Sequence, residues 1–268
     1  MDFFNATLLG VIQGLTEFLP VSSSAHLILA RAVFGWDLDR FGLPFDVACH
    51  VGTLLALIVY FRREVTAMLV WLPGALAGGT QPAARLLRLI IVGTIPAVLV
   101  GLVFNRYIEG HLRTPLVAAL ALALGAIALL VAERAAVHRR AENAITMGDA
   151  LLIGMAQAIA LIPGVSRSGA TLAMALFLGV RRAGAARFVF LLGIPAILAA
   201  AAHEGLVLRH EPLGRNELQI FAVGVVVSAI VGYLTVKFFI QYLSDHSLDV
   251  FAWYRLALAG VVGVWLLR

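Results

Sequence analysis

The chain has 268 residues, of which 62% are hydrophobic and 13% are charged, and its mean hydropathy is +0.97. Because an ordinary globular domain carries about 25% charged residues, this composition excludes a soluble protein and predicts one embedded in a membrane bilayer. The net charge of +5 lies in short clusters between apolar runs, which argues against a nucleic-acid-binding protein. With Cys49 as its one cysteine, the chain can form neither an internal disulfide nor a thiolate metal site.

Six apolar stretches are long enough to cross the hydrocarbon core as helices, which takes about 20 mostly apolar residues. They are residues 44–61, 89–105, 114–132, 187–203, 218–236 and 250–267. The stretch 65–84 is also uncharged, but prolines and glycines interrupt it, so we expect an interfacial cytoplasmic segment there. The first residues lack a basic region and include Asp2, so a cleaved signal peptide is not expected.

Two further apolar stretches, 6–30 and 149–180, are interrupted at their centres by TEFLPVSSSAH and LIPGVSRSGAT. Proline removes a backbone donor and clashes with the preceding turn, so each stretch predicts a helix, a break and a second helix. Each half is too short to cross the membrane alone, so both stretches are expected to be re-entrant helical hairpins. The expected fold is therefore an all-α polytopic membrane protein with six transmembrane helices plus two re-entrant hairpins, in a single membrane domain spanning 1–268.

The charges of the connecting segments predict the orientation, because short loops rich in Lys and Arg stay in the cytoplasm. An excess of arginine marks three segments as cytoplasmic: 62–88, 133–142 and 181–187. Balanced or acidic charge marks three others as external: 31–40, 106–113 and 204–217. These signs alternate only if neither hairpin spans the membrane. Both termini are then outside, the first hairpin enters from outside, and the second enters from the cytoplasm.

The two interrupted stretches also form an internal repeat. At a constant offset of 144 the pairs are Gly10 and Gly154, Gln13 and Gln157, Val21 and Val165, Ser22 and Ser166, and Ser24 and Ser168. Repeat 1 covers about 6–133 and repeat 2 about 149–267, each with three spans after its hairpin. An odd number of spans inverts the second copy, and inverted repeats bring two broken helices together near the membrane midplane.

Ionisable side chains inside the membrane are candidate functional groups, because a charge at the bilayer centre costs roughly 2.5–3.5 kcal/mol. The first hairpin contains Glu17 and His26. Gln13 and Glu17 are four residues apart and share a helix face. The serines 22–24 can cap the helix that follows the break, which places His26 in or near its first turn.

In the second hairpin, Gly164 and Gly169 give the backbone conformational freedom, and Ser166 and Ser168 flank Arg167. A guanidinium, hydroxyl groups and the N–H groups of a helix N-terminus together predict a phosphate site.

Structural interpretations compete with this one. The breaks can be simple kinks, His26 a polar contact, and Arg167 a partner that neutralises Glu17. Asp46 and His50 lie one turn apart at the start of the first span. They can either support the site residues from behind or simply lie at the membrane interface, and we expect the interface.

Four segments carry a resemblance to a known family. They are QGLTEFLPVSSSAH (13–26), PGVSRSGAT (163–171), FDVACHVGTLLA (45–56) and IPAVLVGL (95–102). The chain resembles, over essentially its whole length, the undecaprenyl-diphosphate phosphatases of the bacitracin-resistance type. The resemblance implies a bacterial inner (plasma) membrane enzyme that hydrolyses undecaprenyl diphosphate to undecaprenyl phosphate and inorganic phosphate, recycling the lipid carrier for cell-wall synthesis. It also implies dependence on a divalent cation, Mg²⁺ or Ca²⁺.

The resemblance suggests roles for the motif residues. Arg167 would clamp the diphosphate, while Glu17, with Gln13, would bind the cation or act as a base. His26 and Ser23 compete for the nucleophile and proton-transfer roles. The expected substrate-binding residues are Ser22, Ser24, Gly164, Ser166, Ser168, Gly169 and Thr171. The family's first motif has either Glu or Gln at position 13. Because this chain has Gln there, it lacks one negative charge, which argues against a two-carboxylate metal site.

Other functions stay open from the residues alone. Broken helices in inverted repeats are also typical of transporters, so a transporter or flippase of a polyprenyl-phosphate lipid is the main alternative. A second class of lipid phosphatase needs a histidine shortly after its Ser-Arg segment, and His203 is the first to follow Arg167. A purely structural membrane protein is the third alternative. The first hairpin's external entry predicts an active site facing the periplasm or cell exterior, and a homodimer is left open.

Overall fold

The computed structural model describes residues 2–36, 41–137, 139–208 and 214–267, and within these ranges it consists of helices and their connections. The helices are α1 (Asp2–Thr16), α2 (Ser23–Phe34), α4 (Leu43–Tyr60), α5 (Arg62–Val70), α6 (Leu72–Leu76), α7 (Pro82–Tyr107), η1 (Ile108–Leu112), α8 (Pro115–Ala135), η2 (Glu142–Ala144), α9 (Met147–Ile159), α10 (Arg167–Phe177), α11 (Arg182–Leu208), α12 (Arg215–Asp245) and α13 (Asp249–Leu266).

The six predicted spans are confirmed as long apolar helices in the described part of the chain. They are α4, the Pro82–Phe104 part of α7, α8, the Arg182–His203 part of α11, α12 and α13. The chain is therefore a multi-pass membrane protein. Its α7 begins seven residues before the predicted span at 89, because Pro82 suits a first helical position and Arg88 donates to Gly79 O (2.8 Å).

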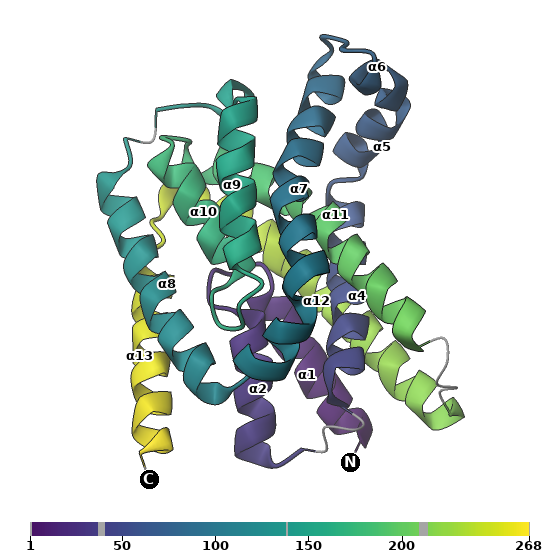
Figure 1. Cartoon of the computed structure of the whole chain (residues 1–268), viewed down its shortest axis with the longest axis vertical. Coiled ribbons are helices and arrows are strands. Elements are labelled where there is room, and N and C mark those ends of the chain that lie inside the picture. Colours follow the sequence, from purple (N-terminus) through teal and green to yellow (C-terminus); the bar gives the residue numbers. More distant parts are fainter. Residues whose placement is uncertain (1, 37–40, 138, 209–213, 268) are drawn as a thin grey trace.

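Both interrupted stretches fold as two short helices joined by a break. The first pair is α1 and α2, and the second is α9 and α10. The pairs lie at opposite ends of the molecule, with their breaks near its middle (Figure 1). Each break contacts the start of the helix that follows the other break: Gly164 N donates to Ser24 Oγ of α2 (3.2 Å), and Ser168 Oγ of α10 donates to Leu19 O (3.0 Å). Their re-entrant placement in a membrane and the inverted repeat stay predictions.

The connections divide between the two ends as the charge pattern predicts. The chain termini and the turn between α7 and α8 lie at one end, and α5 and α6 lie at the other (Figure 1). Parts of the predicted external loops, residues 37–40 and 209–213, fall outside the described residues, as does residue 138 in a predicted cytoplasmic one.

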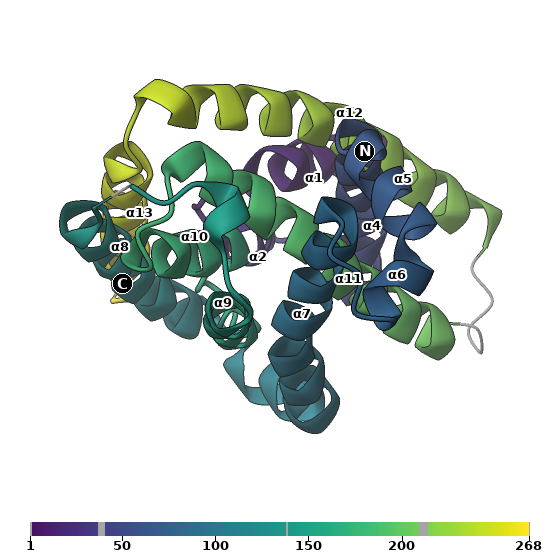
Figure 2. The same ribbon diagram turned by 90° about the horizontal axis from the view of Figure 1, so that it is seen from above.

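Small residues hold the first pair against α12. A Cβ atom added to Gly14 of α1 would lie 2.9 Å from Gly232 N of α12, so only glycine permits this approach. Phe18, just after α1, is fully buried and meets Phe190 of α11 edge to face, with 5.5 Å between ring centroids. Seen from above, α1 and α12 run along one side of the molecule, whereas α9 and α7 lie on the other (Figure 2). These contacts fix where the first break sits.

Candidate active site

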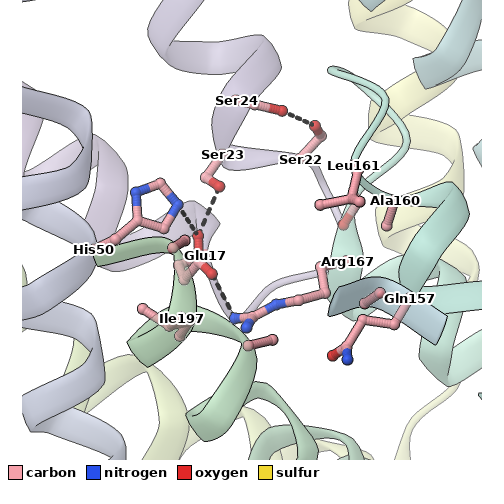
Figure 3. Close-up of a pocket in the computed structure, with 14 residues that line it drawn as sticks. Glu17, Ser22, Ser23, Ser24, His50, Gln157, Ala160, Leu161, Arg167 and Ile197 are labelled. Atoms are coloured by element: carbon pink, nitrogen blue, oxygen red, sulfur yellow. Dashed lines mark hydrogen bonds and ion pairs between the residues drawn. The ribbon is translucent and has the colours of Figure 1, made fainter. Parts of the chain in front are cut away.

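A cavity of about 190 Å³ lies where the two breaks meet. Glu17, Ser23, His50 and Arg167 point toward one another around it (Figure 3). Its lining residues are Glu17, Ser22, Ser23, Ser24, His50, Ala97, Gln157, Ala160, Leu161, Ser166, Arg167, Ala196, Ile197 and Ala200. One part of the wall is therefore polar and comes mainly from the breaks and the helix starts that follow them, with His50 of α4 and Gln157 of α9. The rest is apolar and comes mainly from α7 and α11.

Glu17 is the centre of the polar wall. Its Oε1 accepts a hydrogen bond from Nη2 of Arg167 (2.5 Å). Its Oε2 accepts hydrogen bonds from Gln13 Nε2 (2.9 Å) and Ser23 Oγ (2.7 Å) and lies 3.3 Å from His50 Nε2. Donors surround the carboxylate, and Glu17 is only 6% exposed, so the site is built to hold a negative charge at this residue.

Two equivalent serines end the breaks. Ser22 (φ 73°) and Ser166 (φ 70°) are the described non-glycine residues with a positive φ, a conformation that L-residues rarely adopt. Each caps the helix that follows: Ser22 Oγ accepts from Ala25 N, and Ser166 Oγ accepts from Gly169 N. Both helices therefore begin at the cavity, where their N-terminal N–H groups favour an anion.

Arg167, the first residue of α10, is held at both ends of its guanidinium. Nη1 donates to Gly193 O on α11 (3.0 Å), and Nη2 binds Glu17. A Cβ on Gly193 would lie 2.8 Å from Nη1, so the glycine lets the guanidinium reach the α11 backbone. The side chain is still 21% exposed, which leaves it accessible to a ligand in the cavity.

The two halves of the cavity differ at corresponding positions. At the offset of 144, Gln13 corresponds to Gln157, Glu17 to Leu161, and Ser23 to Arg167. The first hairpin thus supplies an acid and a hydroxyl, whereas the second supplies a cation.

His26 is not brought into this cluster. Its Nδ1 faces Ser22 O (2.7 Å), and its Nε2 faces the hydroxyl of Tyr254 on α13 (2.7 Å). The two rings also stack at 6°. His26 is not one of the described residues that line the cavity. Of the two candidate nucleophiles, His26 and Ser23, only Ser23 contacts Glu17.

His50 lines the cavity beside Glu17, so it is part of the site and does more than occupy the end of a span. Its Nδ1 lies 2.7 Å from Asp46 O, an acceptor, so Nδ1 carries a proton. Its Nε2 faces Glu17, so that contact is favourable when Nε2 carries a proton too. Asp46 itself is buried in ion pairs with Arg31 and Arg113. Only its spacing to Asp46 marked His50 in the sequence.

The remaining predicted binding residues divide into two groups. Ser22, Ser24 and Ser166 line the cavity. Gly164, Ser168, Gly169 and Thr171 instead hold the backbone. Gly164 (φ 97°) packs so closely on α8 that an added Cβ would lie 2.6 Å from Ala118 O. Thr171 Oγ1 donates to Arg167 O (2.7 Å) and so stabilises the first turn of α10.

Arg255 of α13 is fully buried and was not predicted as a site residue. Its guanidinium donates to five backbone carbonyl groups: Leu122, Ala121, Pro20, Gly164 and Val165. Pro20 lies in the first break, whereas Gly164 and Val165 lie in the second. The side chain therefore ties both breaks to α8 and positions the cavity without lining it.

A divalent cation would find one carboxylate here. Gln13 contacts Glu17, and its Oε1 is buried without a hydrogen-bond partner in the described part of the chain. No group of three or more His, Cys, Asp or Glu side chains suited to a metal occurs among the described residues. Mg²⁺ is often held by one or two carboxylates together with substrate phosphates. The residues therefore fit a cation that brings phosphate ligands and do not form a complete cage.

Comparison with known proteins identifies the family of the chain. The family model described as bacitracin resistance protein BacA matches residues 6–261. An undecaprenyl-diphosphatase of Rubrobacter xylanophilus is 46% identical over 272 residues, which cover 100% of this chain and 99% of the relative. Undecaprenyl-diphosphatases of Thioalkalivibrio sulfidiphilus and Chromohalobacter salexigens are each 45% identical, covering 96% and 99% of this chain and 97% and 99% of those relatives. The likeness includes both breaks.

Proposed function

Because the chain belongs to the bacitracin resistance protein BacA family, we propose that it hydrolyses undecaprenyl diphosphate to undecaprenyl phosphate and inorganic phosphate. The reaction would recycle the lipid carrier for cell-wall synthesis. One observation carries the proposal: Ser23 donates to Glu17, and Arg167 binds the same carboxylate, in a cavity where two helices begin. An alcohol, a base and a guanidinium together can supply the nucleophile, its activation and the charge stabilisation for phosphoryl transfer.

The geometry supports a two-step displacement. Ser23 Oγ attacks the terminal phosphorus, its proton passes to Glu17 Oε2, and the bond from that phosphorus to the bridging oxygen breaks. Undecaprenyl phosphate leaves and takes the proton, and the terminal phosphoryl group stays on Ser23. Water then attacks this phosphoserine, gives a proton to Glu17, and releases inorganic phosphate as Ser23 regains its proton.

Arg167 changes partner in this scheme. In the structure its Nη2 donates to Glu17 Oε1. A diphosphate entering the cavity competes for the same guanidinium, whose planar fork can bind two phosphoryl oxygens at once. The N-terminal N–H groups of α2 and α10 stabilise the negative charge that develops on the transferred phosphoryl group.

The proposal includes a divalent cation, Mg²⁺ or Ca²⁺. Glu17 and the free Oε1 of Gln13 are the residues that would hold it. When bound, the cation neutralises charge on the phosphoryl oxygens of the substrate.

We place the enzyme in the bacterial inner membrane with its cavity facing the periplasm or cell exterior. Ala97, Ala196 and Ala200 line the cavity beyond the internal prolines of α7 and α11, Pro96 and Pro195. These halves of α7 and α11 lead toward the end that carries both termini, which the loop charges assign to the outside (Figure 1).

Phosphate release by the purified protein from undecaprenyl diphosphate tests the function. We expect Arg167→Ala to lose turnover. The control Arg134→Ala should keep it, because Arg134 is exposed at the end of α8. Lipid binding without phosphate release would favour a transporter or flippase.

A further inference from the structure

Gln157 of α9 is a buried polar residue that the proposed chemistry leaves without a role. It is 2% exposed, and neither its Nε2 nor its Oε1 has a hydrogen-bond partner among the residues that the structure describes. Burying an amide without a partner destabilises a folded protein. Gln157 lines the same cavity as Arg167 and is drawn next to it in Figure 3.

The corresponding glutamine of the first hairpin shows what Gln157 lacks. Gln13 Nε2 donates to Glu17 Oε2 (2.9 Å), four residues along the chain. Four residues after Gln157 the chain has Leu161, which cannot accept a hydrogen bond from it. The first glutamine thus has an anion within the protein, and the second does not.

The charges around Gln157 indicate the missing partner. Of the described residues that line the cavity, Glu17 is the one that carries a carboxylate, and Gln13, Ser23 and Arg167 already bind it. The second hairpin contributes Arg167 and Gln157, both hydrogen-bond donors. A prenyl chain has no acceptor for an amide N–H, whereas a phosphoryl oxygen accepts such a bond well.

We infer that Gln157 is a substrate-binding residue, whose Nε2 donates to a phosphoryl oxygen of the diphosphate and so gains the anionic partner that Gln13 has in Glu17. The identity of the anion rests on the proposed function. Gln157 and Arg167 then form the diphosphate-binding half of the cavity, opposite the half that contains Ser23 and Glu17.

The test uses the purified full-length protein and the variants Gln157→Leu and Gln157→Glu. The KM and kcat for undecaprenyl diphosphate are measured together with the affinity for inorganic diphosphate and the melting temperature without ligand. Gln81→Leu is the matched control, because Gln81 Oε1 is also buried without a partner in the described structure but lies outside the cavity lining.

Gln157→Leu should weaken the binding of inorganic diphosphate and raise KM by roughly 10- to 100-fold, the effect of losing one hydrogen bond to a charged group. It should leave the melting temperature unchanged or higher, because an unpaired amide is replaced by an apolar group of similar size. Gln157→Glu should weaken binding further, since it places a negative charge beside the diphosphate.

Two results separate the inference from the proposed function. If the wild-type protein binds inorganic diphosphate in a Gln157-dependent way but releases no phosphate from the lipid, the inference stands and the proposed function fails. If the wild-type protein turns over, and Gln157→Leu keeps its KM and diphosphate affinity, the inference is overturned. A lower melting temperature with unchanged KM would likewise overturn it, because the amide would then serve the fold.

Discussion

The hydroxyl of Ser23 donates a hydrogen bond to Oε2 of Glu17 over 2.7 Å, across the break between α1 and α2. This contact joins an alcohol to a carboxylate base inside the cavity. His26, three residues farther along α2, instead turns to Tyr254 of α13. The geometry therefore favours serine as the nucleophile of the site.

Ser23→Ala should lower kcat on the order of 10³-fold or more, because it removes the attacking oxygen. Brief reaction of the wild-type protein with radiolabelled lipid diphosphate, followed by acid quenching, should trap an acid-stable phosphoserine at Ser23. Ser244→Ala serves as the control, since Ser244 is exposed at the end of α12. An acid-labile phosphohistidine at His26 would contradict the assignment.

Arg167→Ala should lower turnover about 10³-fold or more, because charge stabilisation in the transition state is lost. Its folded yield should stay near normal, since Glu17 keeps its contacts with Gln13, Ser23 and His50. Arg167→Lys retains the charge without the planar fork, so we expect an intermediate rate. Phosphate release and melting curves of the two variants check this, and wild-type activity in Arg167→Ala would remove the residue from the chemistry.

His50 should act on the reaction through Glu17. We expect His50→Ala to reduce kcat by roughly 10- to 100-fold, the effect of losing a hydrogen bond to a charged partner. His50→Gln should recover part of this loss, because its amide N–H can still donate to Glu17. A purely space-filling role would make His50→Leu, which is similar in size but has no donor, as active as His50→Gln, so that comparison of kcat, with KM as the second readout, decides.

Arg255 should matter for stability before activity. Arg255→Met leaves five buried backbone carbonyl groups without their donor, and we expect it to lower the free energy of unfolding by about 3–5 kcal/mol. Denaturant titration in detergent measures this. The control Arg62→Met removes an exposed arginine with one long hydrogen bond to Val59 O (3.4 Å) and should change little. Equal stabilities would show that Arg255 does not tie the breaks together.

The spans and the two breaks could be predicted because their signals are local. Length and hydropathy indicate a spanning helix, and the segments around Pro20 and Pro163 interrupt a helix wherever they occur. The meeting of Glu17 with Arg167 was also expected from the predicted inverted repeat, because such repeats bring two broken helices together.

Side-chain orientation set by distant elements could not be predicted. His26 lies beside Ser23 and Ser24 in the chain, yet its ring turns to Tyr254. His50 lies in an apolar helix, and only the packing of α4 brings it to the first break. Arg255 is one charge in a long span, and its carbonyl partners come from three separate segments. A single sequence contains no local signal for such contacts.

Cation binding should depend on the phosphate ligand. The cavity offers the carboxylate of Glu17 and the free Oε1 of Gln13, so the protein alone should bind Mn²⁺, used as a spectroscopic probe, only weakly. Adding inorganic diphosphate should strengthen the uptake of Mn²⁺ by the wild-type protein beyond that of diphosphate alone, because the phosphoryl oxygens complete the coordination. A chelator should abolish phosphate release, and Mg²⁺ or Ca²⁺ should restore it.

In Glu17→Gln the diphosphate-dependent uptake of Mn²⁺ should disappear, whereas in Glu109→Gln, which changes an acid of η1 outside the cavity lining, it should persist. Tight Mn²⁺ binding without diphosphate, or uptake unchanged in Glu17→Gln, would show that the cation is held elsewhere.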